Sequence, residues 1–399
     1  MVPAVQPGRF NAQQASAVLF AQTLQHVAPD AVYVVGGDAT QTPRSSRTLE
    51  GAGWLRNPRT PPFMTGIHAA QRWFNGSWLL PAEQGHSRAL PLRWLPAFTA
   101  KSRPVAHPPA TEWEAAVQFL GWVRQELTRH GRAHQRVLMV GDGHYDTLDL
   151  WQRLPEGVIL LARSARNRVL YHLPGVQSGR GRRRKYGARA LSPQQLWQHR
   201  QGWRPHPHGA RHSAPPAGEG ARSVSASGCT GAPAHADRGA RQAQRAHPPP
   251  LPFLVNAVQD ENGAWGLPLP LATLLFWAWQ RWELEVCHRE LKANFGLGDK
   301  QCWNPIAAVA SVQWSAWVYA LLLLAGYRTW GLSTAPPVPT RWWRGASRWS
   351  LNTLWRAFRA TVWGDHDFRP LCALTTDDWG EKEALLLALR NAAFASARA

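Results

Sequence analysis

Two short apolar runs, each leading through glycine to an aspartate, constrain the fold of this chain more than any other feature. Residues 32–35 lead to Asp38, and residues 137–140 lead to Asp142. Short runs rich in Val, Leu and Met are typical of buried strands, so each strand is expected to deliver an Asp at or just past its end. Residues 111–130 carry a capping box and an apolar stripe at helical spacing, which predicts a helix between the strands. This alternation indicates a mixed α/β sheet.

A third acidic residue, Glu285, lies in a helix that we predict over residues 271–295 and that ends at a Gly-Leu-Gly sequence. At about 100° per residue, Glu283 and Glu290 point to one side of this helix. The opposite face presents Arg281, Glu285, Arg289 and Lys292. Carboxylates from separated elements suit hard divalent cations, and a two-metal site is a common means of cutting phosphodiesters. A surface ion-pair network is the alternative, and helix geometry alone leaves both open.

The charge of the chain indicates a polyanionic partner. Lys and Arg number 45 and Asp and Glu 25, which gives +20 at pH 7. Nucleic acid is the first expected partner and an anionic membrane surface the second. A GC-rich coding sequence that favours Arg codons is the alternative explanation. The four cysteines form no CxxC pair, and the first residues lack a signal-peptide pattern, so we expect neither zinc nor disulfides, and a cytoplasmic location.

Several motifs, taken together, resemble the DDE transposases of bacterial insertion sequences, in the group with a tyrosine-arginine-glutamate-lysine signature. Arg281, Glu285 and Lys292 reproduce the spacing R-x-x-x-E-x-x-x-x-x-x-K, whereas Ala278 stands at the tyrosine position. The resemblance covers residues 31–195 and 251–330. It is also carried by GDAT at 37–40, VGDGHYD at 140–146 and the basic run RGRRRKYG at 180–187.

The resemblance implies a ribonuclease H-like fold, a mixed sheet flanked by helices and interrupted by an insertion between the second aspartate and the glutamate helix. Asp38, Asp142 and Glu285 would be the catalytic residues and the ligands of two Mg²⁺ or Mn²⁺ ions. The side chains expected to bind DNA are Arg281, Arg289, Lys292, Arg182, Arg183, Arg184 and Lys185.

The implied activity is metal-dependent cleavage and strand transfer of DNA by an insertion-sequence transposase, or by a decayed copy that has lost activity. Double-stranded DNA at transposon ends and targets is the expected partner, with a homodimer assembling on it at the bacterial nucleoid. The leading alternative is a basic nucleic-acid-binding protein without catalysis. A membrane-associated protein is the third, because residues 306–326 are apolar and near the length of a membrane span. We prefer a buried core helix there, and expect no membrane partner.

Composition and resemblance together divide the chain. The parts are a short helical segment (1–30), the first part of the ribonuclease H-like core (31–175), an insertion (176–255), the second part of the core with the Glu285 helix (256–330), and a basic-aromatic helical region (331–399). Within the insertion, residues 199–250 contain Val224 as their one Val, Ile, Leu, Met or Phe. Such a segment buries too little apolar surface to fold, so we predict that it is disordered or translated out of frame.

Two local patterns carry further predictions. Asn75-Gly76 is a strong turn signal, so residues 68–80 are predicted to form a hairpin around it. Asp146 could compete with Asp142 as a metal ligand, but its position before a predicted helix is better explained by helix capping.

Overall fold

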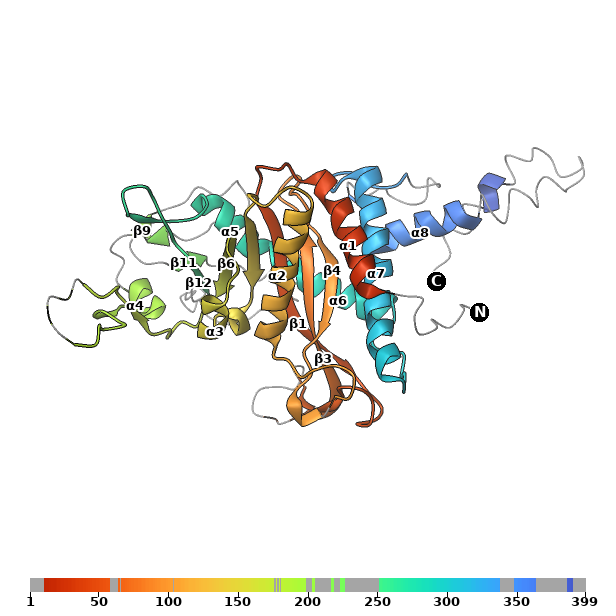
Figure 1. The fold of residues 1–399 in the computed structure, drawn as a ribbon. Helices are drawn as coiled ribbons and strands as arrows, with labels where there is room; N and C mark the ends of the chain where they lie inside the picture. The colour runs from red at the N-terminus through yellow and green to blue at the C-terminus, as the bar shows by residue number, and fades with distance from the viewer. Residues whose placement is uncertain are drawn as a thin grey trace, which may run out of the picture.

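The computed structural model describes residues 11–57, 64, 66–102, 104–175, 177, 179, 181–198, 203–204, 217–218, 223–226, 251–337, 348–363 and 386–389. In this part of the chain one large sheet runs through the molecule with helices on both of its faces (Figure 1).

The central sheet has eight strands in the order β11-β12-β6-β5-β1-β3-β2, and β4 also pairs with β3. Its strands are β1 (Tyr33–Pro43), β2 (Gly53–Arg56), β3 (Ile67–Leu79), β4 (Ala89–Pro96), β5 (Val137–Gly141), β6 (Val158–Arg163), β11 (Ser223–Ala226) and β12 (Leu251–Val255). β1, β5 and β6 are parallel neighbours, and the other pairs are antiparallel. This curled mixed sheet confirms the α/β class and is compatible with a ribonuclease H-like fold.

The helices and short strands complete the described chain. They are α1 (Ala12–Thr23), η1 (Leu24–His26), η2 (Ala100–Ser102), α2 (Glu112–Arg129), η3 (Gly143–Tyr145), α3 (Leu148–Gln152), β7 (Leu170–Tyr171), β8 (Arg189–Ala190), α4 (Pro193–Gln198), β9 (Trp203–Arg204), β10 (Ala217–Gly218), β13 (Val258–Gln259), β14 (Trp265–Gly266), α5 (Leu271–Gln280), α6 (Trp282–Asn294), α7 (Pro305–Trp330) and α8 (Leu351–Val362).

The strands predicted from the two apolar runs are present, and both lie at the centre of the sheet. Their apolar side chains are buried because parallel strands are covered by helices on both faces. The prediction that Asp38 ends its strand was wrong, since β1 continues to Pro43. β5 stops pairing with β1 at Gly141, but β3 remains hydrogen-bonded to β1 on its other side and keeps it extended.

The predicted turn at Asn75-Gly76 is absent, and β3 is one strand of 13 residues that passes straight through this dipeptide. A Cβ atom at Gly76 would lie 2.5 Å from the ring of Phe119 in α2. The glycine therefore allows close packing of a helix on the sheet rather than a turn. A shift in the β3–β4 register between Gly76 and Ser77 marks the same place as a bulge.

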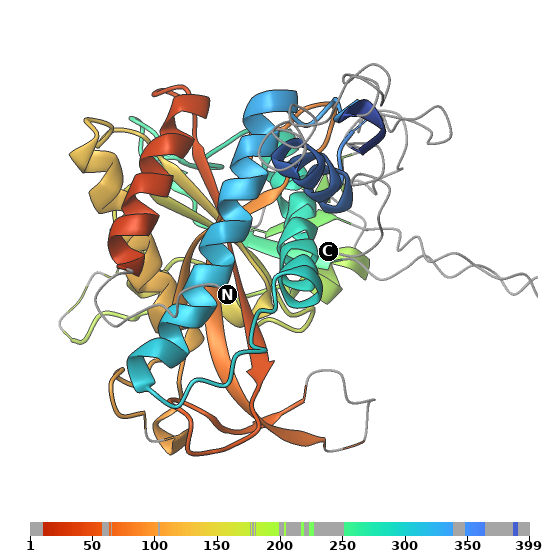
Figure 2. The ribbon, with the colours of Figure 1, turned by 90° about the vertical axis from the view of Figure 1, so that its right-hand side faces the viewer.

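Helices α2 and α6 cover opposite faces of the sheet. Gly36 lies under Leu284 of α6, whereas Gly76, paired with Gly37, lies under Phe119 of α2. Successive strand residues point to opposite faces, so the two helices enclose β1 between them. α1 and α7 pack together against β4, beyond β3 (Figure 2).

The long helix predicted over residues 271–295 is divided into α5 and α6 at Arg281. Arg281 keeps right-handed helical angles, with φ −51° and ψ −31°, so the backbone is not unwound at the point where the two helices meet. The predicted Gly-Leu-Gly end is confirmed: Gly296 and Gly298 have φ of 59° and 91°. In the left-handed region these angles favour glycine and end the helix.

Within the described residues, α7 is the helix long and apolar enough to cross a membrane, a test that core helices also pass. Within α7, the side-chain amide of Gln313 donates to the carbonyl of Trp94 at 2.9 Å, and the indole N–H of Trp317 donates to the carbonyl of Ala15 at 3.2 Å. These contacts bind α7 to β4 and α1, as expected for a helix that packs on the sheet.

Part of the predicted basic-aromatic region is described. Its helix α8 begins at a capping box formed by Ser350 and Thr353. Trp355 packs edge-on against Phe295 with ring centroids 5.1 Å apart, which joins α8 to the end of α6. Residues 338–347, 364–385 and 390–399 of this region lie outside the described residues.

The predicted disordered segment, residues 199–250, lies mostly outside the described residues. Within it the structure describes the backbone of β9, β10 and β11, and β11 pairs with β12 at the edge of the main sheet. The prediction of disorder or out-of-frame translation therefore stays a prediction.

Out-of-frame translation can be tested on the coding DNA. We expect that one of the other two frames across codons 199–250 encodes Val-, Ile- and Leu-rich segments that join the chain at Leu251. Strands need such residues, whereas the present composition offers Val224 alone. Translation of codons 150–198 in the same two frames is the control. If neither frame across 199–250 is richer in apolar residues than the control, the segment is an evolved linker.

Candidate active site

α6 runs alongside β1 in matched steps. Four helical residues advance about 6 Å and two strand residues advance about 6.6 Å, so contacts repeat along both elements. Residues of α6 four positions apart meet residues of β1 two positions apart: Leu284 with Gly36, His288 with Asp38, and Lys292 with Thr40. The helix thereby lays its polar face along the strand that carries Asp38.

Asp38 and Asp142 lie at equivalent positions of neighbouring strands. β1 and β5 are in parallel register up to Gly37 and Gly141, and each aspartate is the next residue. Asp142 caps η3 by accepting a hydrogen bond from the backbone N–H of His144 at 2.9 Å. The parallel register of β1 and β5 therefore brings both carboxylates together where β5 ends, which we call the carboxylate edge.

The carboxyl group of Asp38 is held in a strongly perturbed state. Burial is the largest cause and the negative charge of Asp142 the second; together with the charge of Glu285 they raise the pKa of Asp38 to about 7. The guanidinium of Arg281 and a hydrogen bond of 2.9 Å from the N–H of Ala39 act in the opposite direction. A buried carboxylate beside other carboxylates is the setting in which a cation would be strongly favoured.

Glu285 lies close enough for its charge to raise the pKa of Asp38, but its carboxylate is hydrogen-bonded to another residue. It accepts a hydrogen bond from the guanidinium of Arg281 at 2.8 Å, one helical turn earlier. Among the described residues, no group of three His, Cys, Asp or Glu side chains is arranged to hold a metal ion. The structure thus brings the three predicted carboxylates into electrostatic contact without assembling them into a preformed cluster, and their shared metal site stays a prediction.

The donor atoms at this edge fit a hard divalent cation. Asp38 and Asp142 offer carboxylate oxygens at neighbouring positions of β1 and just past β5, and Glu285 on α6 lies near enough for its charge to raise the pKa of Asp38. The buried hydroxyl of Tyr145 has no hydrogen-bond partner among the described residues, and burial, followed by the negative charge of Asp38, raises the pKa of Tyr145. A set of oxygen ligands with excess negative charge matches Mg²⁺ or Mn²⁺.

Two further titratable residues lie beside Asp142. The exposed ring of His144 contacts the Asp142 carboxylate at 3.2 Å, and this hydrogen bond raises the pKa of His144. Glu112, at the start of α2, pairs with Arg72 at 3.3 Å, and burial raises its pKa. Neither was predicted; His144 follows Asp142 by two residues, which was its signal in the sequence.

His288 is the other residue that sequence reasoning missed. Its ring lies 3.8 Å from the Asp38 carboxylate and 3.1 Å from the amide of Asn75, and burial lowers the pKa of His288 to about 3. At 100° per residue, His288 falls between Leu284 and Lys292, on the face that meets β1. The helical geometry that singled out Glu285 could therefore have identified it.

The predicted DNA-binding residues of the glutamate helix have different environments. Lys292 donates to the hydroxyl of Thr40 at 2.7 Å, two residues beyond Asp38. Arg281 is mostly buried and pairs with Glu285, whereas Arg289 is exposed. Lys292 and Arg281 thus flank the carboxylates, and Arg289 lies on the outer surface of α6.

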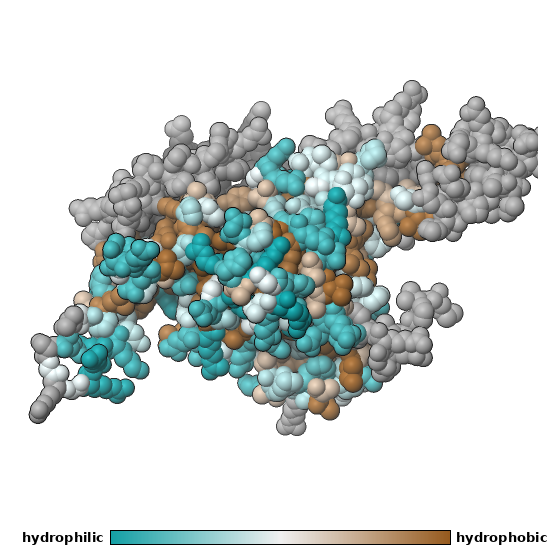
Figure 3. Space-filling model, turned by 45° about the horizontal axis from the view of Figure 1, so that its top comes forward, coloured by the Kyte–Doolittle hydropathy of each residue, from teal (hydrophilic) through white to brown (hydrophobic). Residues whose placement is uncertain are grey.

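The predicted basic run is not close to these carboxylates. Arg182, Arg183, Arg184 and Lys185 are exposed in the segment between β7 and β8. This segment extends from one end of the sheet, away from β1 and α6 (Figure 1), and its hydrophilic side chains project at the left of Figure 3. It forms a separate basic surface.

Asp146 is a structural residue, but not as a helix cap. The cap of α3 is Thr147. Asp146 is buried and accepts hydrogen bonds from Ser164 at 2.6 Å and Trp151 at 3.0 Å, and it pairs with Arg168 at 3.1 Å. These partners occupy its carboxylate, so the structure explains Asp146 without a metal.

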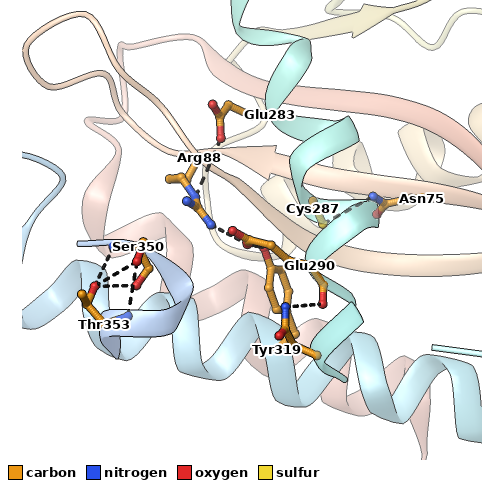
Figure 4. Close-up of polar contacts among 9 residues, drawn as sticks. Asn75, Arg88, Glu283, Cys287, Glu290, Tyr319, Ser350 and Thr353 are labelled. Atoms are coloured by element: carbon orange, nitrogen blue, oxygen red, sulfur yellow. Dashed lines mark hydrogen bonds and ion pairs between the residues drawn. The ribbon is translucent and has the colours of Figure 1, made fainter. Parts of the chain in front are cut away.

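Glu283 and Glu290 lie on the other side of α6, as the helical geometry predicts. Both contact the guanidinium of Arg88, at 3.8 Å and 2.6 Å respectively, and Tyr319 of α7 donates to Glu290 at 2.6 Å. Figure 4 shows this cluster on the β4 side of α6. It fixes the helix to β4 and α7 and leaves the face that meets β1 to the carboxylate edge.

The amino-acid sequence matches a known protein family. A sequence model of the family described as DDE superfamily endonuclease matches residues 3–214, more than half of the chain. The chain therefore belongs to the DDE superfamily of endonucleases. The match includes Asp38 and Asp142 and ends before Glu285. No curated protein matches the chain. Membership implies a nuclease that acts on DNA, and nucleases of this superfamily generally use divalent metal ions.

The raised pKa of Asp38 predicts how stability depends on pH without metal. The folded-state pKa of about 7 exceeds the ordinary 3.8, so the stabilisation that the protonated group contributes is complete below about pH 4 and is lost as pH rises to about 7. The loss is up to about 1.4 kcal/mol per pH unit. Asp38→Asn, which cannot ionise, should be more stable than the wild type at pH 8 in EDTA. At pH 4 the stabilities of the two proteins should differ less.

Thermal unfolding of both proteins at these two pH values is the measurement. Asp149→Asn, at an exposed aspartate of α3, is the matched control and should show no such difference. A gap between Asp38→Asn and wild type that does not grow with pH would contradict the prediction.

Proposed function

We propose that this protein is an insertion-sequence transposase that cleaves DNA and transfers the cut strand, with Asp38, Asp142 and Glu285 as ligands of two Mg²⁺ or Mn²⁺ ions. The observation that carries the proposal is the parallel register that places Asp38 on β1 beside Asp142 just past β5, with Glu285 on α6 near enough for its charge to raise the pKa of Asp38. Family membership supports a DNA nuclease; transposition and strand transfer are our extension of it.

The position of each side chain gives it a different role. Asp38 and Asp142 are held by their strands, so they supply a rigid pair of oxygen ligands, and Glu285 completes the set from α6. Bound metal would supply activation of water or of a DNA 3′-hydroxyl and stabilisation of the leaving oxygen. Arg281 now neutralises Glu285. Glu285 would be the residue of α6 that holds the metal, and the guanidinium of Arg281 beside it would bind a DNA phosphate.

Lys292 has a simpler role. Its ammonium group lies on Thr40, beyond Asp38 on the same face of β1, where a DNA strand crossing the carboxylates would pass. A cation there positions the phosphate backbone without reading sequence. The exposed basic run at 182–185 would bind DNA farther from the cut. We propose that a homodimer assembled on DNA, at the nucleoid, uses both surfaces.

A second candidate is a DNA-binding protein without catalysis, a decayed copy. Two observations favour it: Ala278 replaces the tyrosine of the resembled signature, and Glu285 is paired with Arg281 rather than gathered with Asp38 and Asp142. The two candidates differ in one measurement. Full-length protein is incubated with a plasmid that carries the DNA flanking its own gene, in Mg²⁺, Mn²⁺ or EDTA. Metal-dependent cleavage supports the transposase, and binding without cleavage supports the second candidate.

Substitutions on α6 should separate binding from chemistry. Lys292→Ala and Arg281→Ala should each weaken DNA binding and lower the salt slope by about 0.9, because each removes one phosphate contact. Glu285→Ala should leave binding intact and abolish cleavage, because it removes a metal ligand and no cation. Fluorescence anisotropy at several salt concentrations and a plasmid cleavage assay measure the two effects.

Glu283→Ala is the matched control for Glu285→Ala, since Glu283 lies on the opposite side of the same helix and contacts Arg88. It should alter stability and leave cleavage by the folded protein unchanged. Equal loss of binding in the Lys292, Arg281 and Glu285 variants would indicate that these charges form a structural ion-pair network.

A further inference from the structure

We propose that His288 is a positioning residue for Asp38, and that a buried hydrogen-bond relay from Ser77 through Asn75 sets its tautomer. The relay joins β3, α6 and β1 beside the carboxylate edge. The part of this inference that concerns metal rests on the proposed function; the part that concerns the relay rests on the contacts alone.

The relay has three contacts in line. The hydroxyl of Ser77 donates to Asn75 Oδ1 at 3.0 Å, and Asn75 Nδ2 lies 3.1 Å from His288 Nε2. The other ring nitrogen, Nδ1, faces Asp38 Oδ2 at 3.8 Å. Ser77 and Asn75 are fully buried and His288 is 8% exposed, so water competes little for these groups.

The order of donors settles which nitrogen of His288 carries the proton. Because Ser77 donates to the carbonyl oxygen of Asn75, the amide NH₂ group of Asn75 points at Nε2, which must then accept. A neutral imidazole with an accepting Nε2 carries its hydrogen on Nδ1. That N–H faces Asp38. Above about pH 7, where Asp38 is ionised, the reverse arrangement would set a bare Nδ1 lone pair against a carboxylate, which is repulsive, so the tautomer is specified in that pH range.

The consequence for Asp38 is that its two oxygens face different groups. Oδ1 accepts the N–H of Ala39 at 2.9 Å, and Oδ2 faces the Nδ1–H of His288. At 3.8 Å the second contact is a charge–dipole attraction and longer than a hydrogen bond. Together the two contacts restrict rotation of the carboxylate, as outer partners of metal ligands commonly do.

Packing alone does not account for this arrangement. The His288 ring also lies edge-on to Trp94, with centroids 5.5 Å apart, and that contact is satisfied by either tautomer. Asn75 could equally be replaced by an apolar residue if the position served only the core. A buried amide that is oriented by Ser77 and aimed at the ring indicates that one protonated nitrogen is specified.

The first test needs no metal. Nitrogen-15 NMR of histidine-labelled protein in EDTA, with His288→Gln used to assign the signal, reports the tautomer. We expect Nδ1–H in the wild type. Asn75→Asp offers only acceptor oxygens to Nε2 and should convert His288 to the Nε2–H form or protonate both nitrogens. An Nε2–H signal in the wild type overturns the relay.

The second test measures Mn²⁺ affinity by titration calorimetry on the full chain. His288→Ala and Asn75→Leu should each weaken Mn²⁺ binding by about 10-fold or more. His288→Asn, whose amide nitrogen lies near the position of Nδ1, should recover part of the loss. Leu291→Ala, a buried control on the same helix, should lower stability and leave the affinity unchanged. Wild-type affinity in folded His288→Ala overturns the positioning role.

The two proposals fail differently. If the wild type binds Mn²⁺ no better than Asp38→Asn does, the proposed metal site is wrong, and the positioning role toward metal falls with it. The metal-free NMR result then upholds or overturns the relay by itself. If the wild type binds Mn²⁺ and His288→Ala binds it equally well, the metal site stands and the positioning role does not.

Discussion

Asp38→Asn is expected to lower Mg²⁺-dependent DNA cleavage by about 10³-fold and to leave DNA binding unchanged. Charge stabilisation by a bound metal ion contributes several kcal/mol to such a reaction, and about 1.4 kcal/mol corresponds to a factor of ten in rate. An amide keeps the size of the side chain but offers one weaker oxygen ligand. Burial and the negative charge of Asp142 raise the pKa of Asp38 to about 7, so a cation beside this carboxylate would be strongly favoured and its loss should be costly.

Cleavage is measured on the plasmid substrate, and binding on a short duplex from the same DNA in the presence of Ca²⁺. Asp149→Asn removes an equal charge from an exposed position of α3 and should cleave as the wild type does. If Asp38→Asn retains more than about a tenth of wild-type cleavage, several kcal/mol cannot depend on this carboxylate.

Arg88→Met is expected to cost about 3 kcal/mol of unfolding free energy. The Arg88 guanidinium lies between Glu283 and Glu290 and is largely buried (Figure 4). It also stacks over the ring of Trp349, with its central carbon 5.2 Å from the ring centroid. Removing it leaves two partly buried carboxylates without their cation, which is far more costly than losing an exposed pair. Urea unfolding, followed by tryptophan fluorescence, measures the change.

The matched control is Arg289→Met, on the exposed surface of α6, which should change stability by less than about 0.5 kcal/mol. Adding Glu290→Gln to Arg88→Met should restore part of the loss, because it removes the closer of the two unpaired charges. A double variant as unstable as Arg88→Met alone would show that packing of the Arg88 stem, rather than charge, dominates.

Local patterns predicted much of the fold. The apolar runs before Asp38 and Asp142 became the central strands, and the capping box at Thr111 and Glu114 begins α2. Helical spacing also separated the two faces of α6 correctly, since Glu283 and Glu290 meet Arg88 while Lys292 meets Thr40. These predictions succeeded because burial imposes a period on the sequence, and that period is visible without knowing the partner.

The failed predictions share a physical cause, which is that a partner distant in sequence outweighed a local preference. Asn75-Gly76 has a turn sequence, but Phe119 requires a glycine there and β1 pairs with Asn75, so the strand continues. Asp146 has a capping sequence, but Ser164 and Arg168, which follow about 20 residues later, bind its carboxylate. Neither partner can be inferred from the residues around the motif.

The sequence by itself determined which residues have the chemistry: strand-borne Asp38 and Asp142, a helical Glu285 flanked by Arg281 and Lys292, and a basic chain that favours DNA. Only the tertiary structure decided how they meet. It placed the two aspartates side by side on neighbouring strands, paired Glu285 with Arg281, and set His288 beside Asp38. The reason is that periodicity specifies the face on which a side chain lies, whereas the register between a helix and a strand depends on packing of residues about 250 positions apart.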